Sequence, residues 1–490
     1  MSSPALYRVQ EEVPEGVAYR GHRFDNPSSC FSWMVATVHG CQCGPHVAIG
    51  RTRNIRRKEE LMKLRNLGVL GAAGMLAITA AVPAFAQSPA SMGTLKIGIE
   101  LPLSGASVAN GEPTKNGILL AIKQANEAGG VGGYTLVDNT QDDAKDGVPN
   151  PEQGAANMAT LVADEAVVGV VGPFNSGVAR FEIPVSNAAG LAQCSPANTG
   201  VDLTKEGSEA YRPEKPDQRN YFRVATPDDI QGPAAAALAY NDAGARNIFV
   251  VDDTTAFGVG VGDSFSAAFI ELGGTIAGRQ GNDYAENQDF NPMLTALGGN
   301  FDSVFFAGTQ TLGGGQIRKQ MGQQDILDKP LIGPDGIADL QAGGNEGAFI
   351  TLAGVENSGN VWGTTAGINE IPDPEAFKVA YSAEFGQDPG AYSALAYACA
   401  QILIQSIDAA VAAGATDMAG IREGVRANVF SGAEFTTVLG PLSIDANGDS
   451  SQKFISFWKT DPTLNEGKGG WVFVRQQDFG GAAPAASTAP

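Results

Sequence analysis

Histidine is nearly absent from this sequence. The chain holds three, His22, His39 and His46, and none follows in the rest of its 490 residues. Ser-His and Cys-His catalytic pairs and imidazole metal sites all need a histidine ring. Beyond residue 46 the sequence therefore excludes these chemistries together. We expect a protein without catalytic residues, metal or other cofactor.

Cysteine is also scarce, with five residues in the chain. Cys30, Cys41 and Cys43 lie near its start and lack the paired spacing of a structural zinc site. Cys194 and Cys399 are far apart in the sequence. An oxidising compartment would permit a disulfide between them, but two lone cysteines are more often buried and free. The sequence leaves their state open.

Positively charged residues are few. The chain has 32 Lys and Arg against 53 Asp and Glu, which gives a formal net charge of −21. A nucleic-acid partner would need clustered basic residues, so this class is excluded. An acidic surface suits a soluble protein that avoids non-specific association. Hydrophobic residues make up 43% of the chain, enough for a sizeable core, and its length allows two to four domains.

A single apolar run, residues 67–82, decides the expected localisation. It follows the basic start Met62, Lys63 and Arg65 and precedes the small-x-small site 84–86. These are the three parts of a secretory signal peptide, and the run is short and glycine-rich for a membrane anchor. We predict a signal peptide at 62–86 and a periplasmic protein. The residue directly after the cleavage site is Gln87, not a cysteine, so a lipid anchor is not indicated.

Both ends of the chain are expected to lie outside the folded part. Signal peptides begin at the N-terminus, so residues 1–61 are predicted to be a non-native extension, with Met62 as the true start. Residues 58–60 read Lys-Glu-Glu, whose codons resemble a bacterial ribosome-binding site. The segment 480–490, rich in Ala, Pro and Gly, is predicted to be a flexible tail.

From residue 94 onward, strand and helix patterns alternate. Alternation of this kind predicts parallel sheets covered on both faces, and the chain is too long for one such core. The fold class is therefore α/β, with two doubly wound parallel-sheet lobes. The predicted strands are 95–99, 134–137, 167–171, 191–194, 248–251, 303–306 and 331–332. The predicted helices open at Pro113, after a cap at Ser176 and at Gln316, and cover 152–164, 262–272, 375–385 and 391–413.

The candidate binding loops follow these strands, because ligands of open parallel sheets bind beyond the carboxyl ends of the strands. In the first series, residues 172–177 and 195–200 offer hydroxyls and backbone N–H groups suited to a carboxylate. In the second series, residues 252–258 and Asp335 lie at equivalent ends, and Asp335 could face an ammonium. This pattern predicts a zwitterion site, although ordinary turns and helix caps use the same residues.

The sequence resembles the periplasmic leucine/isoleucine/valine-binding proteins, type I solute-binding proteins of ABC importers, over residues 95–474. The order and spacing of several short motifs carry the resemblance: Lys96-Ile97-Gly98 to Leu103-Ser104-Gly105, Gly172 to Ser176, Ser195-Pro196-Ala197-Asn198-Thr199, Phe222-Arg223-Val224, Asp229-Ile230-Gln231-Gly232, Gly333-Pro334-Asp335-Gly336 and Gly440-Pro441-Leu442. It implies a monomeric binder of a small aliphatic amino acid that hands its ligand to a permease and ATPase complex.

The resemblance also implies roles for single residues. Ser176, Thr199 and the backbone of Ala197 would hold the ligand carboxylate, and Asp335 would accept from its ammonium. Positions where relatives carry pocket-lining aromatic side chains hold Phe257, Asn110 and Thr309 here. The side-chain end of the pocket thus departs from the family pattern, which leaves the exact ligand open.

By the same resemblance the chain crosses between the lobes three times, near Ala225, near 362–366 and near 439–442. The first lobe is then 94–225 plus 365–440, and the second is 227–362 plus 441–476. Closure around a ligand would be a hinge motion at these crossings.

The sequence also bears on three other interpretations. The glycines at 258, 260 and 262 lie too far beyond their strand for a dinucleotide loop, and Asp252 and Asp253 would repel a pyrophosphate. Ser176 lacks the glycine of a nucleophile elbow two positions before it, and no histidine is available. A ligand-sensing subunit, or a binder of an amide, a urea-like compound or a plain carboxylate, remains an alternative with the same fold.

Overall fold

The computed structural model describes residues 92–480. The predicted extension 1–61, the predicted signal peptide 62–86 and residues 481–490 of the predicted tail lie outside this range. The described residues all belong to one compact unit of the chain.

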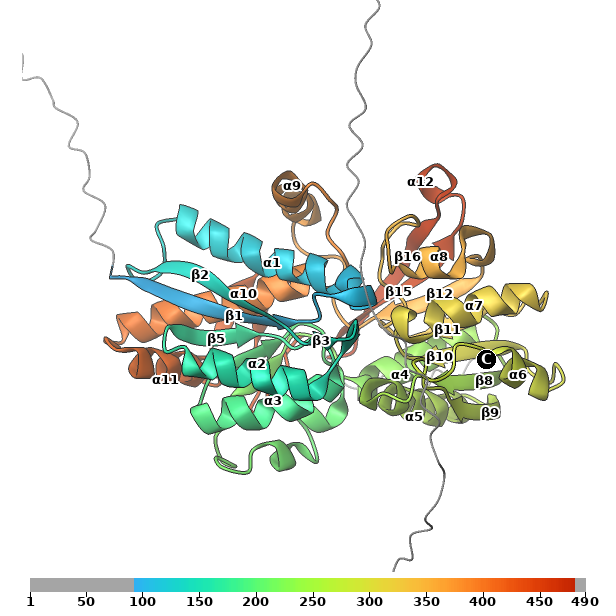
Figure 1. The fold of residues 1–490 in the computed structure, drawn as a ribbon, viewed down its shortest axis with the longest axis horizontal. Coiled ribbons are helices and arrows are strands. Elements are labelled where there is room, and N and C mark those ends of the chain that lie inside the picture. Colours follow the sequence, from blue (N-terminus) through green and yellow to red (C-terminus); the bar gives the residue numbers. More distant parts are fainter. Residues whose placement is uncertain (1–91, 481–490) are drawn as a thin grey trace, which may run out of the picture. The chain divides into compact units, whose positions relative to one another are not determined.

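The first lobe is built on a five-stranded parallel sheet in the order β2-β1-β5-β6-β7 (Figure 1). Its central strand β5 is buried along its whole length, as its Val-Val-Gly-Val-Val sequence requires. The strands are β1 (Thr94–Leu101), β2 (Thr135–Asp142), β5 (Val167–Val171), β6 (Gln193–Ser195) and β7 (Tyr221–Arg223). The helices are α1 (Val108–Glu127), α2 (Pro151–Ala163), α3 (Ser176–Ala189), α9 (Pro374–Phe385), α10 (Ser393–Ala412) and α11 (Met418–Val429), and two small hairpins are β3 (Ala144–Lys145) with β4 (Val148–Pro149) and β13 (Glu434–Thr437) with β14 (Gly440–Ser443).

The second lobe holds a seven-stranded sheet in the order β16-β15-β12-β11-β10-β8-β9. Its strands are β8 (Asn247–Asp252), β9 (Thr275–Gly281), β10 (Ser303–Ala307), β11 (Leu331–Gly333), β12 (Val361–Thr365), β15 (Phe454–Asp461) and β16 (Gly470–Asp478). Its helices are α4 (Asp228–Ala237), α5 (Ala256–Glu271), α6 (Asn291–Ala296), α7 (Gly314–Gln323), α8 (Phe349–Ala353) and α12 (Leu464–Gly467). The prediction of a wholly parallel sheet is wrong for this lobe, because β15 runs antiparallel to both of its neighbours, β12 and β16. The short connection between β15 and β16 allows only a hairpin.

Helix starts are where the sequence prediction was least accurate. α1 begins at Val108, so Pro113 lies inside the helix instead of opening it. Proline has no N–H, which frees the carbonyl of Ala109 one turn earlier, and that oxygen accepts from Gln341 Nε2 of the second lobe at 2.6 Å. Asn175 occupies the N-cap position of α3 without a capping hydrogen bond to its side chain, and Ser176 is the first residue of the helix, not its cap. α5 begins at Ala256, earlier than the predicted residue 262, because Thr255 caps it by accepting from Gly258 N.

Three chain segments meet at Thr226. Its N–H donates to Ala366 O at 2.9 Å, and its hydroxyl donates to Phe454 O at 2.7 Å. The stretch before Phe454 belongs with the first lobe, since Leu442 and Ile444 are part of that lobe's core. We therefore place the third crossing near residues 450–454, later than 439–442.

α10 is the single helix among the described residues that is long and apolar enough to cross a membrane. It is 61% buried inside the protein, and Leu395, Cys399, Ile402 and Leu403 on it are inaccessible or nearly so. The helix is the core helix of the first lobe, packed between α1 and α11.

Candidate ligand site between the two lobes

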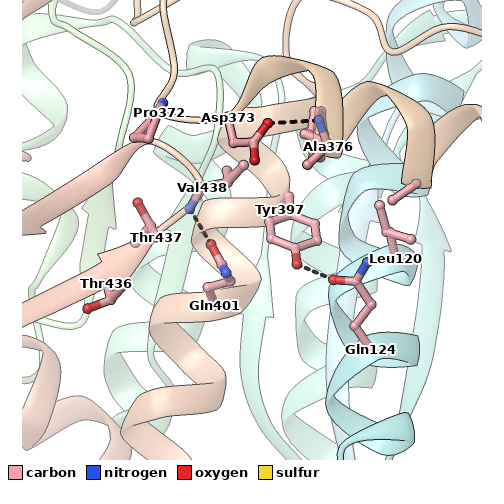
Figure 2. A pocket seen from close by; sticks show the side chains of 12 residues that line it. Leu120, Gln124, Pro372, Asp373, Ala376, Tyr397, Gln401, Thr436, Thr437 and Val438 are labelled. Atoms are coloured by element: carbon pink, nitrogen blue, oxygen red, sulfur yellow. Dashed lines mark hydrogen bonds between the residues drawn. The ribbon is translucent and has the colours of Figure 1, made fainter.

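A cavity of about 320 Å³ lies within the first lobe, among α1, α9, α10 and the β13–β14 hairpin (Figure 2). Its volume would suit a small ligand. Several of its polar side chains, however, are already paired: Tyr397 donates to Gln124, and Gln401 accepts from Val438 N at 2.6 Å. None of the buried, unpartnered polar atoms of residues 92–480 belongs to a residue that lines this cavity. The cavity therefore lacks groups that await a polar ligand.

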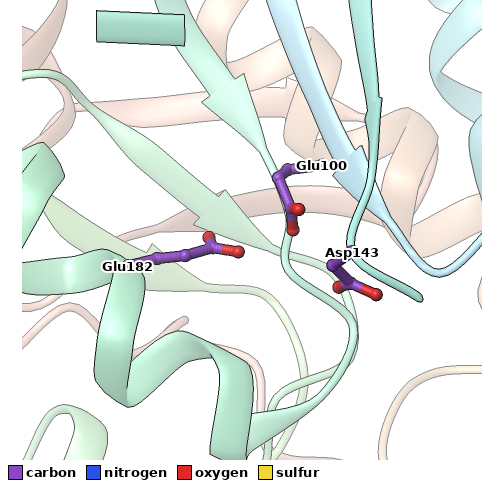
Figure 3. Close-up of side chains that lie close together, drawn as sticks. All are labelled: Glu100, Asp143 and Glu182. Carbon is purple, nitrogen blue, oxygen red and sulfur yellow. The ribbon is translucent and has the colours of Figure 1, made fainter. Parts of the chain in front are cut away.

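A cluster of three buried carboxyl groups, Glu100, Asp143 and Glu182, lies near the ends of β1 and β2 (Figure 3). Their oxygens lie within 4.8 Å of one another, and all three side chains are inaccessible to solvent. Asn157 donates to Glu100 at 2.9 Å and Gln193 donates to Glu182 at 2.7 Å.

Burial, together with the neighbouring negative charges, raises the pKa of Asp143 to about 10 and holds the pKa of Glu182 well above its usual value. The pKa of Glu100 is also raised, chiefly by burial. Burial thus favours the protonated form of these groups. Asn157 and Gln193 pair with two of their oxygens, and the remaining four have no hydrogen-bond partner.

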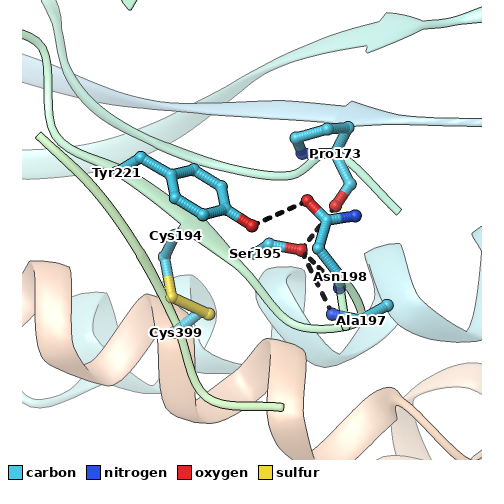
Figure 4. The surroundings of a disulfide bond; sticks show 7 residues. All are labelled: Pro173, Cys194, Ser195, Ala197, Asn198, Tyr221 and Cys399. Carbon is cyan, nitrogen blue, oxygen red and sulfur yellow. Dashed lines mark hydrogen bonds between the residues drawn. A yellow bond between two sulfur atoms is a disulfide. The ribbon is translucent and has the colours of Figure 1, made fainter. Parts of the chain in front are cut away.

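The loops after β5 and β6 contact each other. Gly200 N donates to Ser176 Oγ at 3.2 Å, which joins the start of α3 to the end of the second loop. Within that loop, Ser195 Oγ donates to Pro173 O at 2.7 Å and accepts from the N–H groups of Ala197 and Asn198 (Figure 4). The predicted backbone donor of Ala197 is thus bonded inside its own loop. Thr199 is buried nearby, and its hydroxyl has no partner.

Cys194 and Cys399 form a disulfide bond, so the commoner outcome of two free thiols is not what this protein shows. The sequence distance between them, 205 residues, hid the fact that β6 lies against α10 (Figure 4). The bond ties the loop that carries Ser195 and Thr199 to the helix that begins at Ser393.

Asp335 follows β11 in the second lobe and is only 3% exposed. Its Oδ2 accepts from the hydroxyl of Tyr392, which precedes α10 in the first lobe, at 3.0 Å. Its N–H donates to Gln231 Oε1 at 3.0 Å, while Oδ1 is buried without a partner. Burial raises the pKa of Asp335 to about 6. The residue predicted to meet an ammonium thus presents one unpaired carboxylate oxygen.

Asp228, at the start of α4, was not predicted as a site residue. Its N–H donates to Thr199 O at 2.9 Å, and its Oδ1 accepts from Gln231 Nε2 at 2.9 Å. Its Oδ2 is buried without a partner. Burial, and next the charge of Asp335, raise the pKa of Asp228 to about 7. In the sequence, its position directly before the Asp229-to-Gly232 motif could have pointed to Asp228. That it lies near Asp335 is visible only in the folded structure.

The other predicted residues lie at the same meeting of the lobes. Asn110 and Thr309 line one small cavity of about 10 Å³, together with Phe174. Asn110 also exchanges two amide hydrogen bonds with Gln310 of the second lobe, at 3.1 and 3.4 Å. Phe257 is half-buried, and its ring lies so close to Gly336 that a Cβ there would approach it to 2.9 Å.

Five buried oxygens in this region have no hydrogen-bond partner. Native proteins pair nearly all such groups. Four more unpartnered oxygens belong to the Glu100, Asp143 and Glu182 cluster, whose carboxyl groups lie close enough to share protons. The five where the lobes meet do not belong to that cluster, and they make this region the candidate ligand site. Hydroxyl and helix N-terminal groups on one side suit an anion, and two carboxyl groups on the other suit a cation. The atoms are Asn175 Oδ1, Thr199 Oγ1, Asp228 Oδ2, Thr309 Oγ1 and Asp335 Oδ1.

Comparison with known proteins agrees with this architecture. The model of a family described as periplasmic binding protein matches residues 94–454. A Leu/Ile/Val-binding protein homolog of Brucella melitensis is 32% identical over 375 residues, which cover 76% of this chain and 91% of that protein.

Two solved structures share the fold. The isoleucine-bound substrate-binding protein of a branched-chain amino acid transporter from Streptococcus pneumoniae has a TM-score of 0.62 at 24% identity and covers 78% of this chain and 100% of its own. A benzoate-bound solute-binding protein from R. palustris has a TM-score of 0.62 at 20% identity and covers 78% and 96%. Proteins of this fold therefore hold carboxylate ligands both with and without an ammonium group.

Proposed function

We propose, from the premise that this chain belongs to the periplasmic binding-protein family, that it captures a small aliphatic amino acid between its two lobes and delivers it to an ABC importer. Members of this family bind solutes outside the cytoplasm. The observation that carries the choice of ligand is Asp335: a buried carboxylate with one free oxygen, in the lobe opposite the hydroxyls of Ser176 and Thr199.

The first lobe supplies the anion-binding half of the proposed site. α3 is a helix of 14 residues, and its first N–H groups at Ser176 and Gly177 have no earlier carbonyl of the helix to bond. Such a terminus favours negative charge. The unpartnered hydroxyl of Thr199 adds a neutral donor. Together these groups fit a carboxylate, and the Ala197 N–H would join them if its bond to Ser195 opens.

The second lobe supplies the cation-binding half. A buried carboxylate with a free oxygen is stabilised by an ammonium, and leaving either charge unpaired in a closed site costs on the order of 3–5 kcal/mol. The alternative ligand is a carboxylate without an ammonium, as in the R. palustris relative that holds benzoate. Asp335 and Asp228 favour the zwitterion, because a plain carboxylate would leave both of them without a cation.

The side chain of the ligand would lie toward Asn110, Thr309 and Phe257. Two of these residues are polar where relatives carry aromatic rings. Because the cavity that Asn110 and Thr309 line holds only about 10 Å³, we propose that this end of the site accepts a small side chain. The precursor would be exported through the segment 62–86 and would meet its permease as a monomer, with closure by hinge motion at the segments that meet at Thr226.

A thermal-shift screen of purified residues 87–490 against all amino acids and benzoate tests this proposal. One aliphatic amino acid should raise the melting temperature and bind with about micromolar affinity, roughly −8 kcal/mol, in isothermal titration. A shift with benzoate or an uncharged amide, alongside none with any amino acid, would show the zwitterion assignment to be wrong.

A further inference from the structure

Two acidic side chains, and not one, are buried at the proposed ammonium end of the site. Asp228 and Asp335 are 1% and 3% exposed. Each has one carboxylate oxygen engaged and one without a partner. A site designed around a single ammonium acceptor has no need of the second carboxyl group, so Asp228 calls for an explanation.

Gln231 connects the two groups. Its Nε2 donates to Asp228 Oδ1 at 2.9 Å, and its Oε1 accepts from Asp335 N at 3.0 Å and from Thr364 Oγ1 at 3.1 Å. Three hydrogen bonds hold this amide in one orientation. Asp228 in turn donates its N–H to Thr199 O, so the chain of contacts runs from the carboxylate loop to the ammonium acceptor.

The cationic side chains nearby already have ion-pair partners. Arg223 is buried and bonded to Asp449 at 2.7 Å and to Gly200 O at 2.7 Å. Lys205 pairs with Asp229 at the surface. Burial, and next the charge of Asp335, raise the pKa of Asp228, while the polar side chains of Gln231 and Thr199 and the charge of Arg223 lower it. The pKa of Asp335 is raised by burial and lowered by the Tyr392 hydroxyl, the Gln231 side chain and backbone N–H groups. Asp339 acts on Tyr392 and is itself bonded to backbone N–H groups and Trp471.

We infer that Asp228 is a second acidic residue of the binding site, and that the Asp228–Asp335 pair holds a proton in the free protein and releases it to solvent when a cationic ligand group binds. The inference rests on the proposed function. Two buried carboxylates without a counter-ion repel each other, so retaining a proton is the less costly state. An ammonium beside them removes that need, and the proton leaves.

Proton release makes affinity depend on pH with a definite sign. Binding is at full strength above the pKa values of the free pair, about 7 and about 6. It weakens as pH falls through them, by up to about tenfold per pH unit for each proton released. A ligand carrying only a carboxylate would not release this proton.

Isothermal titration of the amino acid identified by the screen, at pH 6.5 in phosphate and in imidazole buffer, measures the protons released. These buffers differ in ionisation enthalpy, so the difference in observed heat counts protons. The parent protein should release between about 0.3 and 1 proton per ligand and lose affinity from pH 7.5 to pH 5.5. Asp228→Asn keeps the acceptor for Gln231, and it should flatten the pH dependence and reduce the release at least twofold.

Asp339→Asn is the matched control. Asp339 is equally buried and its pKa is also raised to about 6, but both its oxygens are paired. This variant should release as many protons as the parent. Amino-acid binding without proton release in the parent protein would overturn the inference and leave the proposed function standing. Equal release by Asp228→Asn would overturn the role of Asp228. Failure of every amino acid to bind at any pH would overturn both.

Discussion

Tyr392 donates its hydroxyl hydrogen to Asp335 Oδ2 at 3.0 Å, and the two residues belong to different lobes. The same ring packs edge-on against Phe174, with centroids 4.7 Å apart, next to the start of α3. A single side chain therefore touches both the proposed ammonium acceptor and the loop that leads to Ser176. Because this contact bridges the lobes at a buried carboxyl group, we expect it to couple closure of the lobes to binding at the proposed site.

Replacement of Asp335 should impair binding more than that of any other side chain. Asp335→Ala should weaken amino-acid affinity by about 100- to 1000-fold. Asp335→Asn should weaken it nearly as much, because asparagine keeps the shape of the side chain and loses its charge. Ser176→Ala should cost less, roughly 1–3 kcal/mol, because backbone N–H groups still face the carboxylate. Isothermal titration of the three variants measures this order. Parent-like affinity of Asp335→Asn would mean that the ligand has no ammonium there.

Tyr392→Phe removes one hydroxyl and little else. Losing a hydrogen bond to a carboxylate should weaken ligand affinity by about 1.5–3 kcal/mol if Asp335 is ionised in the complex. The hydroxyl lowers the pKa of Asp335, so its loss should also shift the pH dependence of binding upward. Tyr397→Phe, on the same helix but bonded to Gln124, is the control and should bind as the parent does. Equal affinities of both variants would contradict the coupling.

The disulfide should contribute substantially to stability. A cross-link over such a long loop restricts the unfolded chain, and removal of the Cys194–Cys399 bond should lower the unfolding free energy by about 2–5 kcal/mol. Urea denaturation of the parent with and without reductant, and of the double variant Cys194→Ala/Cys399→Ala, measures the loss. The reduced parent and the double variant should behave alike, and an unchanged midpoint in both would refute the prediction.

Stability should fall as pH rises from neutral, because of the buried carboxyl cluster. The pKa values of Glu100, Asp143 and Glu182 are raised in the folded state, so the folded protein holds protons that the unfolded chain has lost. That stability is complete below the unfolded values near 4 and disappears as pH passes the folded values, about 10 for Asp143.

Glu182→Gln should flatten this decline and raise the unfolding free energy at pH 9 by about 1–3 kcal/mol, since one buried acid is replaced by a neutral amide. Denaturant titrations at several pH values measure the effect. The exposed Glu165→Gln is the control and should leave the profile unchanged. A parent protein equally stable at pH 6 and pH 9 would contradict this account.

The sequence alone determined the alternation of elements and the identity of the loops that meet at the site. Strand β5 was predicted over the same residues, because an uninterrupted run of buried-type side chains is a local signal. Parallel strands place their carboxyl ends at one edge, so the loops at Ser176, Thr199 and Asp335 followed from strand order and from the family resemblance.

Tertiary structure alone decided what depends on contacts between distant parts of the chain. The Cys194–Cys399 bond, the pairing of Tyr392 with Asp335 and the nearness of Asp228 to that carboxylate leave no periodic trace in the sequence. The start of α1 before Pro113 is of the same kind, because Gln341 of the other lobe bonds the carbonyl that proline frees. Local patterns carry propensity and burial, whereas partners and shifted pKa values arise only when the folded chain brings separate segments within a few ångströms.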